Sequence, residues 1–467
     1  MVNKEKARKQ IISYVFLFYW LLIFEGALRK WAFPQYNQII FFIRDPIVLL
    51  IYFIAWRNNF IPKDKLLIVA TIISLVYIPL IFIQSVVLKI NYLTLIYGWR
   101  VYFFYIPLAF IIKESFRLED IHKFIKQSLI VAIPLSALIY LQYISPRDSF
   151  INSGYSEGLA FVVAGTTVRT TGTFSFTAGQ TFFASSLMAM LAYVWLYRKQ
   201  YNLMSMPLLL IATGTSMTHL LLSGSRTAFF MTGLIIVSSF IGLMFTKSTK
   251  MKFNGSILII LLILIGAILF IGPFSDSLDK LNQRFENAEN SEGSAILRAM
   301  APLIIFLRHV LTAPVLGFGV GFGTGGGSQL TTGKASLVLA EDEWSRIILE
   351  SGPGFGLAFI IYRGVLTYFI FMKSLQSARR DNNILPMIFF GFIGYHLFNG
   401  QITHIGTLLG YNWLFVGLIM AATLKNTVSV VQDNKPIIKY PNILSSKSIS
   451  KKHNKIPSKA ITINTVV

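Results

Sequence analysis

Apolar runs of about twenty residues recur along most of this sequence. A helix needs roughly 20 mostly apolar residues to cross the hydrocarbon core of a bilayer, and about twelve runs in the chain meet this condition. They cover residues 11–28, 38–56, 65–88, 92–112, 122–144, 180–197, 204–223, 227–246, 255–273, 347–372, 384–401 and 405–424. The pattern predicts an all-α integral membrane protein with about twelve transmembrane helices.

The charge composition agrees with this prediction. Hydrophobic residues make up 54% of the chain and charged residues 13%, whereas soluble domains carry about 25% charged residues. The 42 Lys+Arg residues outnumber the 20 Asp+Glu residues. With a cytoplasmic N-terminus, about 27 of these cations fall in the cytoplasmic loops and the two termini, as the positive-inside rule requires. Topology and anionic lipid therefore explain the positive charge, and nucleic-acid binding is not needed.

The spans predict one polytopic transmembrane domain over residues 1–424 with both termini in the cytoplasm. A basic, disordered cytoplasmic tail is expected over 425–467. The largest outer loop, at about 274–346, joins the ninth and tenth spans, and a second long outer segment covers about 145–179. Within the largest loop, residues 296–311 predict an amphipathic helix on the membrane surface. The chain has no cysteine, which excludes disulfides, thiolate metal sites and a cysteine nucleophile.

Several ionisable residues lie inside the predicted spans, where charge is costly. Glu25 and Arg29 have the i,i+4 spacing of a helical salt bridge, and Arg44 with Asp45 suggests a local pair. Each pair has a packing interpretation and a functional one, and the sequence leaves both open. Arg100 has no acid nearby in sequence. We therefore expect it to find a partner in another span or to face a water-filled cavity.

Arginines recur at the outer ends of the predicted spans. They are Arg29, Arg169, Arg226, Arg298 and Arg346. Positive charge on the outer side runs against the topological bias, so we expect a ligand to hold it there. Guanidinium groups bind phosphate and pyrophosphate bidentately. On the outer leaflet, one such ligand is the pyrophosphate of a polyprenyl-linked glycan donor.

Three segments around the largest outer loop resemble motifs of one membrane enzyme superfamily. The first is LLSGSRTAFF, in which Arg226 occupies the position of a functional arginine. The second begins at Arg298 and continues into a turn from Pro314 to Gly321. The third is EDEWSRIILESGPGFG, at the start of a late span. In this order they resemble the O-antigen ligase/polymerase superfamily of bacterial glycosyltransferases, and FEGALRKW, IRDP and RTTGTFSFTAG are similar to its exopolysaccharide polymerase-type members.

The resemblance implies a GT-C-like fold in the bacterial inner membrane. It implies an enzyme that polymerises or ligates polyprenyl-diphosphate-linked glycan repeat units at the outer face of that membrane, with no metal and no other cofactor. Arginines would stabilise the diphosphate leaving group in place of a metal ion, with Arg226 as a catalytic candidate. The candidates for binding the diphosphate or the glycan are Arg298, Arg346, Arg169, Arg100 and Arg29. The implied partners are the lipid-linked glycan, membrane lipid and other polysaccharide assembly proteins.

The acidic segment from Leu339 to Gly356 is the expected source of the base that activates the acceptor hydroxyl. The ligase pattern carries a histidine at the front of this segment. This sequence has Glu341 there, and it has no histidine between His309 and His396. Glu341 and Glu343 are therefore the candidate bases.

The same segment also has a structural interpretation. Glu343, Arg346 and Glu350 have spacings that place them on one helix face. Either the three form a charge network that fixes the start of the helix, or Arg346 holds one carboxylate while Glu341 or Glu343 takes the proton. Trp344, inside the motif, is a candidate for stacking on a sugar ring.

The glycine-rich run GFGVGFGTGGG, residues 317–327, lacks the Gly-Lys-Ser/Thr ending of a nucleotide-binding loop. We expect instead a mobile loop over an outward-facing cavity. If the chain is a transferase, Arg226, Arg298 and Glu343 should converge on that cavity.

A transporter or flippase of lipid-linked oligosaccharide is the competing hypothesis, and a scaffold without activity is a third. A transporter predicts charges that line a path through both leaflets, whereas an enzyme predicts charges gathered in the outer half. The sequence does not separate a polymerase from a ligase.

Overall fold

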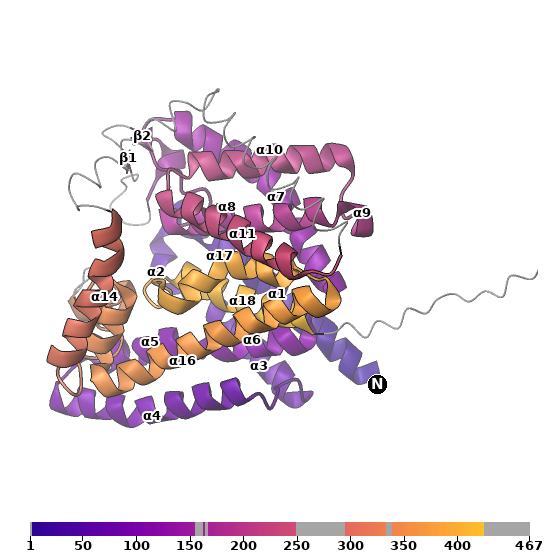
Figure 1. Ribbon diagram of the computed structural model, residues 1–467. Coiled ribbons are helices and arrows are strands. Elements are labelled where there is room, and N and C mark those ends of the chain that lie inside the picture. The colour runs from indigo at the N-terminus through magenta and orange to yellow at the C-terminus, as the bar shows by residue number, and fades with distance from the viewer. Residues whose placement is uncertain (1, 155–161, 164–166, 249–294, 333–338, 425–467) are drawn as a thin grey trace, which may run out of the picture. The chain divides into compact units, whose positions relative to one another are not determined.

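The chain folds into a helical bundle (Figure 1). The computed structural model describes residues 2–154, 162–163, 167–248, 295–332 and 339–424, so the predicted span at 255–273 and the tail at 425–467 lie outside the described residues. The described residues all belong to one compact unit, Met1–Lys425. Its first half contains the helices α1 (Val2–Ala27), α2 (Asn37–Ile40), α3 (Arg44–Arg57), α4 (Lys65–Val87), α5 (Tyr92–Trp99), α6 (Ile106–Ser115), α7 (Leu118–Ile144), α8 (Thr177–Leu196) and α9 (Arg198–Tyr201). Its second half contains α10 (Met206–Leu222), α11 (Arg226–Phe245), α14 (Ala295–Thr312), α15 (Gly325–Thr332), α16 (Glu343–Asp381), α17 (Leu385–Asn399) and α18 (Gly406–Thr423).

Short turns and one small strand pair complete the described structure. The turns are η1 (Leu28–Ala32), η2 (Pro34–Tyr36), η3 (Arg100–Phe104) and η4 (Phe150–Asn152). The strands β1 (Val162–Val163) and β2 (Thr167–Val168) are antiparallel, with Val162 opposite Val168. They lie within the predicted outer segment at 145–179.

Nine described helical segments are long and apolar enough to cross a membrane. Two shorter apolar helices, α10 and α17, occupy two further predicted spans. Together these segments match the predicted runs at every described position, which is compatible with a mainly helical, polytopic membrane protein. The helix predicted at 296–311 is present as α14.

Apolar side chains cover the outside of the bundle as well as its core. In the central helix α18, the run from Leu408 to Ala422 is buried throughout. The peripheral helix α4 instead exposes large apolar residues on one face, such as Ile72, Leu75 and Phe82. A soluble protein rarely exposes so continuous an apolar surface, whereas lipid solvates it well.

Two predicted spans are interrupted where they carry charge. The run at 38–56 forms two helices, because α2 ends at Ile40 and α3 begins at Arg44. The run at 92–112 passes through the π-helical turn η3, which begins at Arg100. Such π-turns inside α-helices are frequent at functional sites. The breaks place Arg44, Asp45 and Arg100 at helix ends.

The long helix α16 folds back on itself near its start. Gly352 has φ 78° and ψ 163°, outside the helical region. In a straight helix, Glu343 and Arg363 would lie about 30 Å apart, yet their side chains form an ion pair of 2.9 Å. The first part of α16, up to Ser351, therefore packs against the second part.

The glycine-rich turn before α15 is held by contacts with α4 and α5. Gln84 of α4 donates to the Leu316 carbonyl at 2.6 Å and accepts from the Val320 N–H at 3.0 Å. Gly321 has φ 84°, and a Cβ atom there would lie 2.4 Å from the Cα of Gly98. The segment expected as a mobile loop is a turn packed against α4, α5 and α16.

Candidate functional site

A cavity of about 620 Å³ opens where α1, α2, α5, α15 and the α17–α18 loop meet. Its walls carry both polar and aromatic side chains. The polar side chains used below are Glu25, Arg29, Asn37, Gln329 and His404, and the aromatic ones are Phe41, Phe42, Tyr97 and Phe176. Cationic and hydrogen-bonding groups beside aromatic rings suit a ligand with an anionic part and sugar rings.

Arg29 is the predicted site residue that lines this cavity. Its Nε donates to the Asn37 side chain at 2.7 Å, and its Nη1 lies 3.3 Å from the Glu25 carboxylate. The other Glu25 oxygen lies 2.7 Å from Nε of Arg44. The helical pair of Glu25 and Arg29 is thus confirmed. The suggested pair of Arg44 with Asp45 is wrong, because the break before α3 turns Arg44 towards Glu25.

Arg100 lies behind the aromatic wall of the cavity. Its guanidinium forms two bonds to the Asp45 carboxylate, at 2.5 and 2.6 Å, and stacks near Phe42 and Tyr97. The Tyr105 hydroxyl donates to the same carboxylate at 2.6 Å. The expected partner in another span is therefore confirmed, and it is Asp45 of α3.

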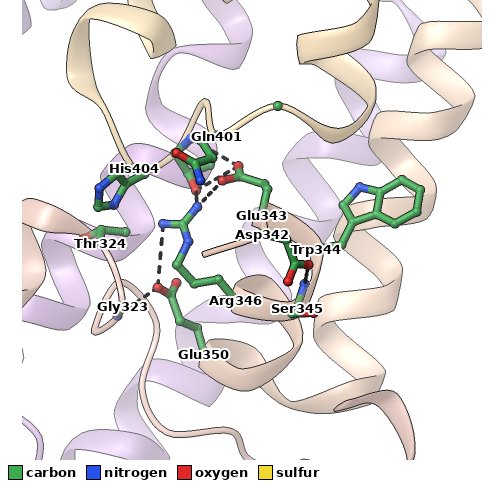
Figure 2. Close-up of polar contacts among 12 residues, drawn as sticks. Gly323, Thr324, Asp342, Glu343, Trp344, Ser345, Arg346, Glu350, Gln401 and His404 are labelled. Atoms are coloured by element: carbon green, nitrogen blue, oxygen red, sulfur yellow. Dashed lines mark hydrogen bonds and ion pairs between the residues drawn. The ribbon is translucent and has the colours of Figure 1, made fainter. Parts of the chain in front are cut away.

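Glu343 lies in a closed ionic network (Figure 2). Its carboxylate accepts from Arg346 and, at 2.9 Å, from Arg363. The backbone N–H and the hydroxyl of Thr403 also donate to it, at 3.2 and 3.1 Å. Three of these donors bind Oε1 and Arg346 binds Oε2, and Glu343 is only 1% exposed. This geometry corresponds to the structural alternative for the acidic segment.

Arg363 extends this network into the α17–α18 loop. Three of its N–H groups bind the backbone at the end of α17, on the carbonyls of His396, Leu397 and Gly400. Arg346 adds a bond of 2.8 Å to the Thr403 hydroxyl. The ions of α16 therefore hold the loop from Gly400 to Thr403 in place.

Glu350 has a different set of partners. One carboxylate oxygen accepts from the Gly321 N–H at 2.9 Å and from the Tyr102 hydroxyl at 2.7 Å. The other accepts from the Gly323 N–H at 2.9 Å. Two backbone amides of the glycine-rich turn thus close on one buried carboxylate, which binds the turn to α16.

His404 follows this fixed loop and lines the cavity. The backbone N–H of Gly325, the first residue of α15, donates to its Nδ1 at 3.1 Å. Because Nδ1 accepts this bond, the neutral ring carries its proton on Nε2. Burial, with a smaller effect of the Arg346 guanidinium, lowers the pKa of His404 to about 4. At neutral pH the ring is therefore an uncharged hydrogen-bond donor through Nε2.

The remaining predicted site residues lie elsewhere. Trp344 donates to the Phe398 carbonyl at 2.9 Å and packs edge-on against its ring, so it is engaged in packing. Glu341 is exposed, and its backbone carbonyl accepts from the Gln401 side chain. Neither Arg226 nor Arg169 is among the residues that line the cavity.

The expected convergence of three residues on one cavity is not found at this site. Arg226 begins α11, and Glu343 is enclosed by its network. Arg298 belongs to α14, but its side chain lies outside what the structure describes. The cavity instead gathers Arg29 with three groups that the sequence did not single out as a site, namely Asn37, Gln329 and His404. Among the described residues, no three His, Cys, Asp or Glu side chains lie close enough to hold a metal ion.

A comparison with protein-family models and with curated proteins finds no match to this chain. The resemblance to the O-antigen ligase/polymerase superfamily therefore depends on the sequence motifs alone, and the function is a proposal.

Proposed function

We propose that this protein is a membrane glycosyltransferase that extends or transfers glycan repeat units from a polyprenyl-diphosphate carrier, and that the 620 Å³ cavity is its transfer site. The observation that carries the proposal is the donor set of this cavity. The side chains that can donate hydrogen bonds and line this one space belong to Arg29, Asn37, Gln329 and His404.

The charge balance around the cavity supports an anionic ligand. Beneath and beside it lie five arginines and four carboxylates, all largely or fully buried, which leaves one positive charge in excess. They are Arg29, Arg44, Arg100, Arg346 and Arg363 against Glu25, Asp45, Glu343 and Glu350. This excess attracts an anionic group such as a diphosphate, and preorganised donors stabilise the charge that develops on such a leaving group.

The acceptor needs a base, and Glu25 is the carboxylate that lines the cavity. Arg29 and Arg44 both form ion pairs with Glu25. In our proposal Arg29 turns to the diphosphate when the donor binds, which leaves Glu25 with one cation and makes it more basic. Glu25 then takes the acceptor proton as the new C–O bond forms and the bond from C1 to the diphosphate oxygen breaks. Glu341 is the alternative base, because it is exposed at the start of α16.

The position of the charges favours an enzyme over a transporter. Glu25 is near the end of α1, Arg44 begins α3, and His404 directly precedes α18. Because successive spans alternate in direction, these positions lie at the same end of the bundle. A transported glycan would instead need a continuous series of such groups along the bundle, whereas the cavity is lined by residues from one end.

The test is the surface glycan of a host that lacks this protein and expresses Arg29→Gln or Glu25→Gln. We expect long glycan to disappear and single lipid-linked repeat units to accumulate on the outer face of the membrane. Arg308→Gln is the matched control, because Arg308 is exposed on α14 and should leave the glycan unchanged. Normal long glycan in both cavity variants contradicts the proposal, and accumulation on the inner face indicates the transporter.

A further inference from the structure

A second recess lies at the opposite end of α16 from the cavity. It is a groove of about 480 Å³ between the last turns of α11 and α16. Its cationic residues are Lys247, Arg379 and Arg380, and its apolar residues are Phe245, Met372 and Leu375. The proposed glycan chemistry does not use this groove.

Asn382 builds the groove by joining the two helix ends. It caps α16 with a left-handed φ of 52°, a conformation that asparagine adopts more readily than most residues. Its side-chain oxygen accepts from the Thr246 hydroxyl at 2.7 Å and from the Lys247 N–H at 2.9 Å. The Tyr197 hydroxyl donates to its backbone carbonyl at 2.8 Å. The bridge fixes Lys247 beside the last turn of α16.

The cations of the groove are not neutralised within the described part of the chain. Lys247, Arg379 and Arg380 are exposed, and no ion pair is present on any of the three side chains there. The groove has no acidic lining residue. A larger groove along α1 differs in this respect, because Glu5 lines it and is paired with Arg8 and Arg117.

The apolar side of the groove restricts what this charge can bind. Phe245 is 44% exposed on the outer face of α11. Met372 and Leu375 continue the apolar surface along α16, one to two turns before the arginines. A ligand that fits therefore has a compact anionic head and a long apolar body, and basic recesses between transmembrane helices bind lipid head groups of this kind.

We infer that the groove between α11 and α16 is a binding site for one anionic phospholipid. The phosphate lies between Arg379, Arg380 and Lys247, and an acyl chain runs along Phe245, Met372 and Leu375. Part of the arginine charge also complements the negative end of the α16 dipole, but that role does not involve Lys247, which follows α11.

The test is native mass spectrometry of the purified full-length protein in detergent, titrated with phosphatidylglycerol or phosphatidylcholine. We expect the wild-type protein to retain one phosphatidylglycerol in preference to phosphatidylcholine. Arg379→Gln/Arg380→Gln should weaken this binding roughly tenfold or more, because each basic group near an anionic head contributes several-fold. The charge-conserving Arg379→Lys/Arg380→Lys variant should retain most of the binding.

Lys63→Gln/Lys65→Gln is the matched control, because it removes the same charge from another exposed pair that does not line the groove. It should bind phosphatidylglycerol within about twofold of the wild type. Equal losses in the lysine and arginine variants, or equal binding of the two lipids by the wild type, overturn the inference. Competition by glycerol phosphate as strong as that by phosphatidylglycerol also overturns it, since a head group alone would then suffice.

Discussion

Two clusters of arginines and carboxylates lie close together in this protein, yet they are built differently. In the cluster of Glu343, Arg346 and Arg363, all three side chains are 0% exposed and their partners are protein groups. In the cluster of Glu25 and Arg29, the side chains line a cavity with His404. The residue types are the same in the two clusters, so what differs is whether the fold leaves a face of the cluster open.

The difference gives the two clusters different roles. The closed cluster stabilises the fold, and the open cluster can bind a ligand. A buried ion pair is favourable when hydrogen bonds satisfy its remaining donors and acceptors. The backbone of the α17–α18 loop does this for Arg363, whereas Nε and Nη1 of Arg346 have no hydrogen-bond partner among the described residues. The closed cluster therefore fixes the loop, and the loop presents His404 to the open cluster. The following four predictions test this division, from the largest expected effect to the smallest.

Glu343→Ala should break the closed cluster and destabilise the protein by about 3–5 kcal/mol, because it leaves two buried guanidinium groups without their shared partner. The measurement is thermal unfolding of the purified protein in detergent. Glu341→Ala is the control, since Glu341 is exposed two residues earlier and its loss should change stability by less than about 0.5 kcal/mol. Similar losses of thermal stability in the two variants would contradict the stabilising role of the closed cluster.

Gly352→Ala should disturb the fold-back that brings Glu343 to Arg363. A side chain at its φ of 78° costs about 1–3 kcal/mol, and its Cβ would lie 1.9 Å from the Val315 carbonyl oxygen. Gly354→Ala is the matched control, because nothing lies within 4 Å of its Cβ position. Alanine is also the better helix former there. Thermal unfolding should show a loss for the first variant and none for the second.

Arg29→Gln should affect the open cluster with a smaller cost in stability, about 1–2 kcal/mol. Glu25 keeps Arg44 at 2.7 Å in this variant, so no buried carboxylate is left alone. Unfolding in detergent, compared with Glu343→Ala, measures the difference. A loss as large as that of Glu343→Ala would show that the two clusters are one structural unit.

His404→Gln should remove a pH dependence of stability. The pKa of His404 is about 4 in the folded protein and ordinarily 6.5, so the unfolded chain binds a proton first as the pH falls. Its contribution is thus constant above pH 6.5 and decreases between pH 6.5 and 4, by roughly 1 kcal/mol at pH 5.5. The melting temperature of the wild type should fall more over this pH range than that of the variant. If the melting temperatures of the two proteins fall equally with pH, His404 is not held neutral.

Much of the fold could be predicted because the bilayer imposes a simple rule on sequence. A helix must be long and apolar to cross it, so α4, α7 and α11 lie close to their predicted bounds. The breaks at Arg44, Arg100 and Gly352 were not predicted. Each is stabilised by partners distant in sequence, such as Glu25 for Arg44, and hydropathy does not report such partners.

The sequence by itself determined the helical membrane fold, the Glu25–Arg29 pair and the concentration of charge near the ends of spans. Those features follow from local periodicity and from the cost of charge in lipid. Only the tertiary structure decided which charged side chains are enclosed by protein groups and which face a cavity. The enclosure depends on the reversal at Gly352 and on the loop before His404, whose contacts across tens of residues enclose Glu343. Arg29 is left facing a cavity.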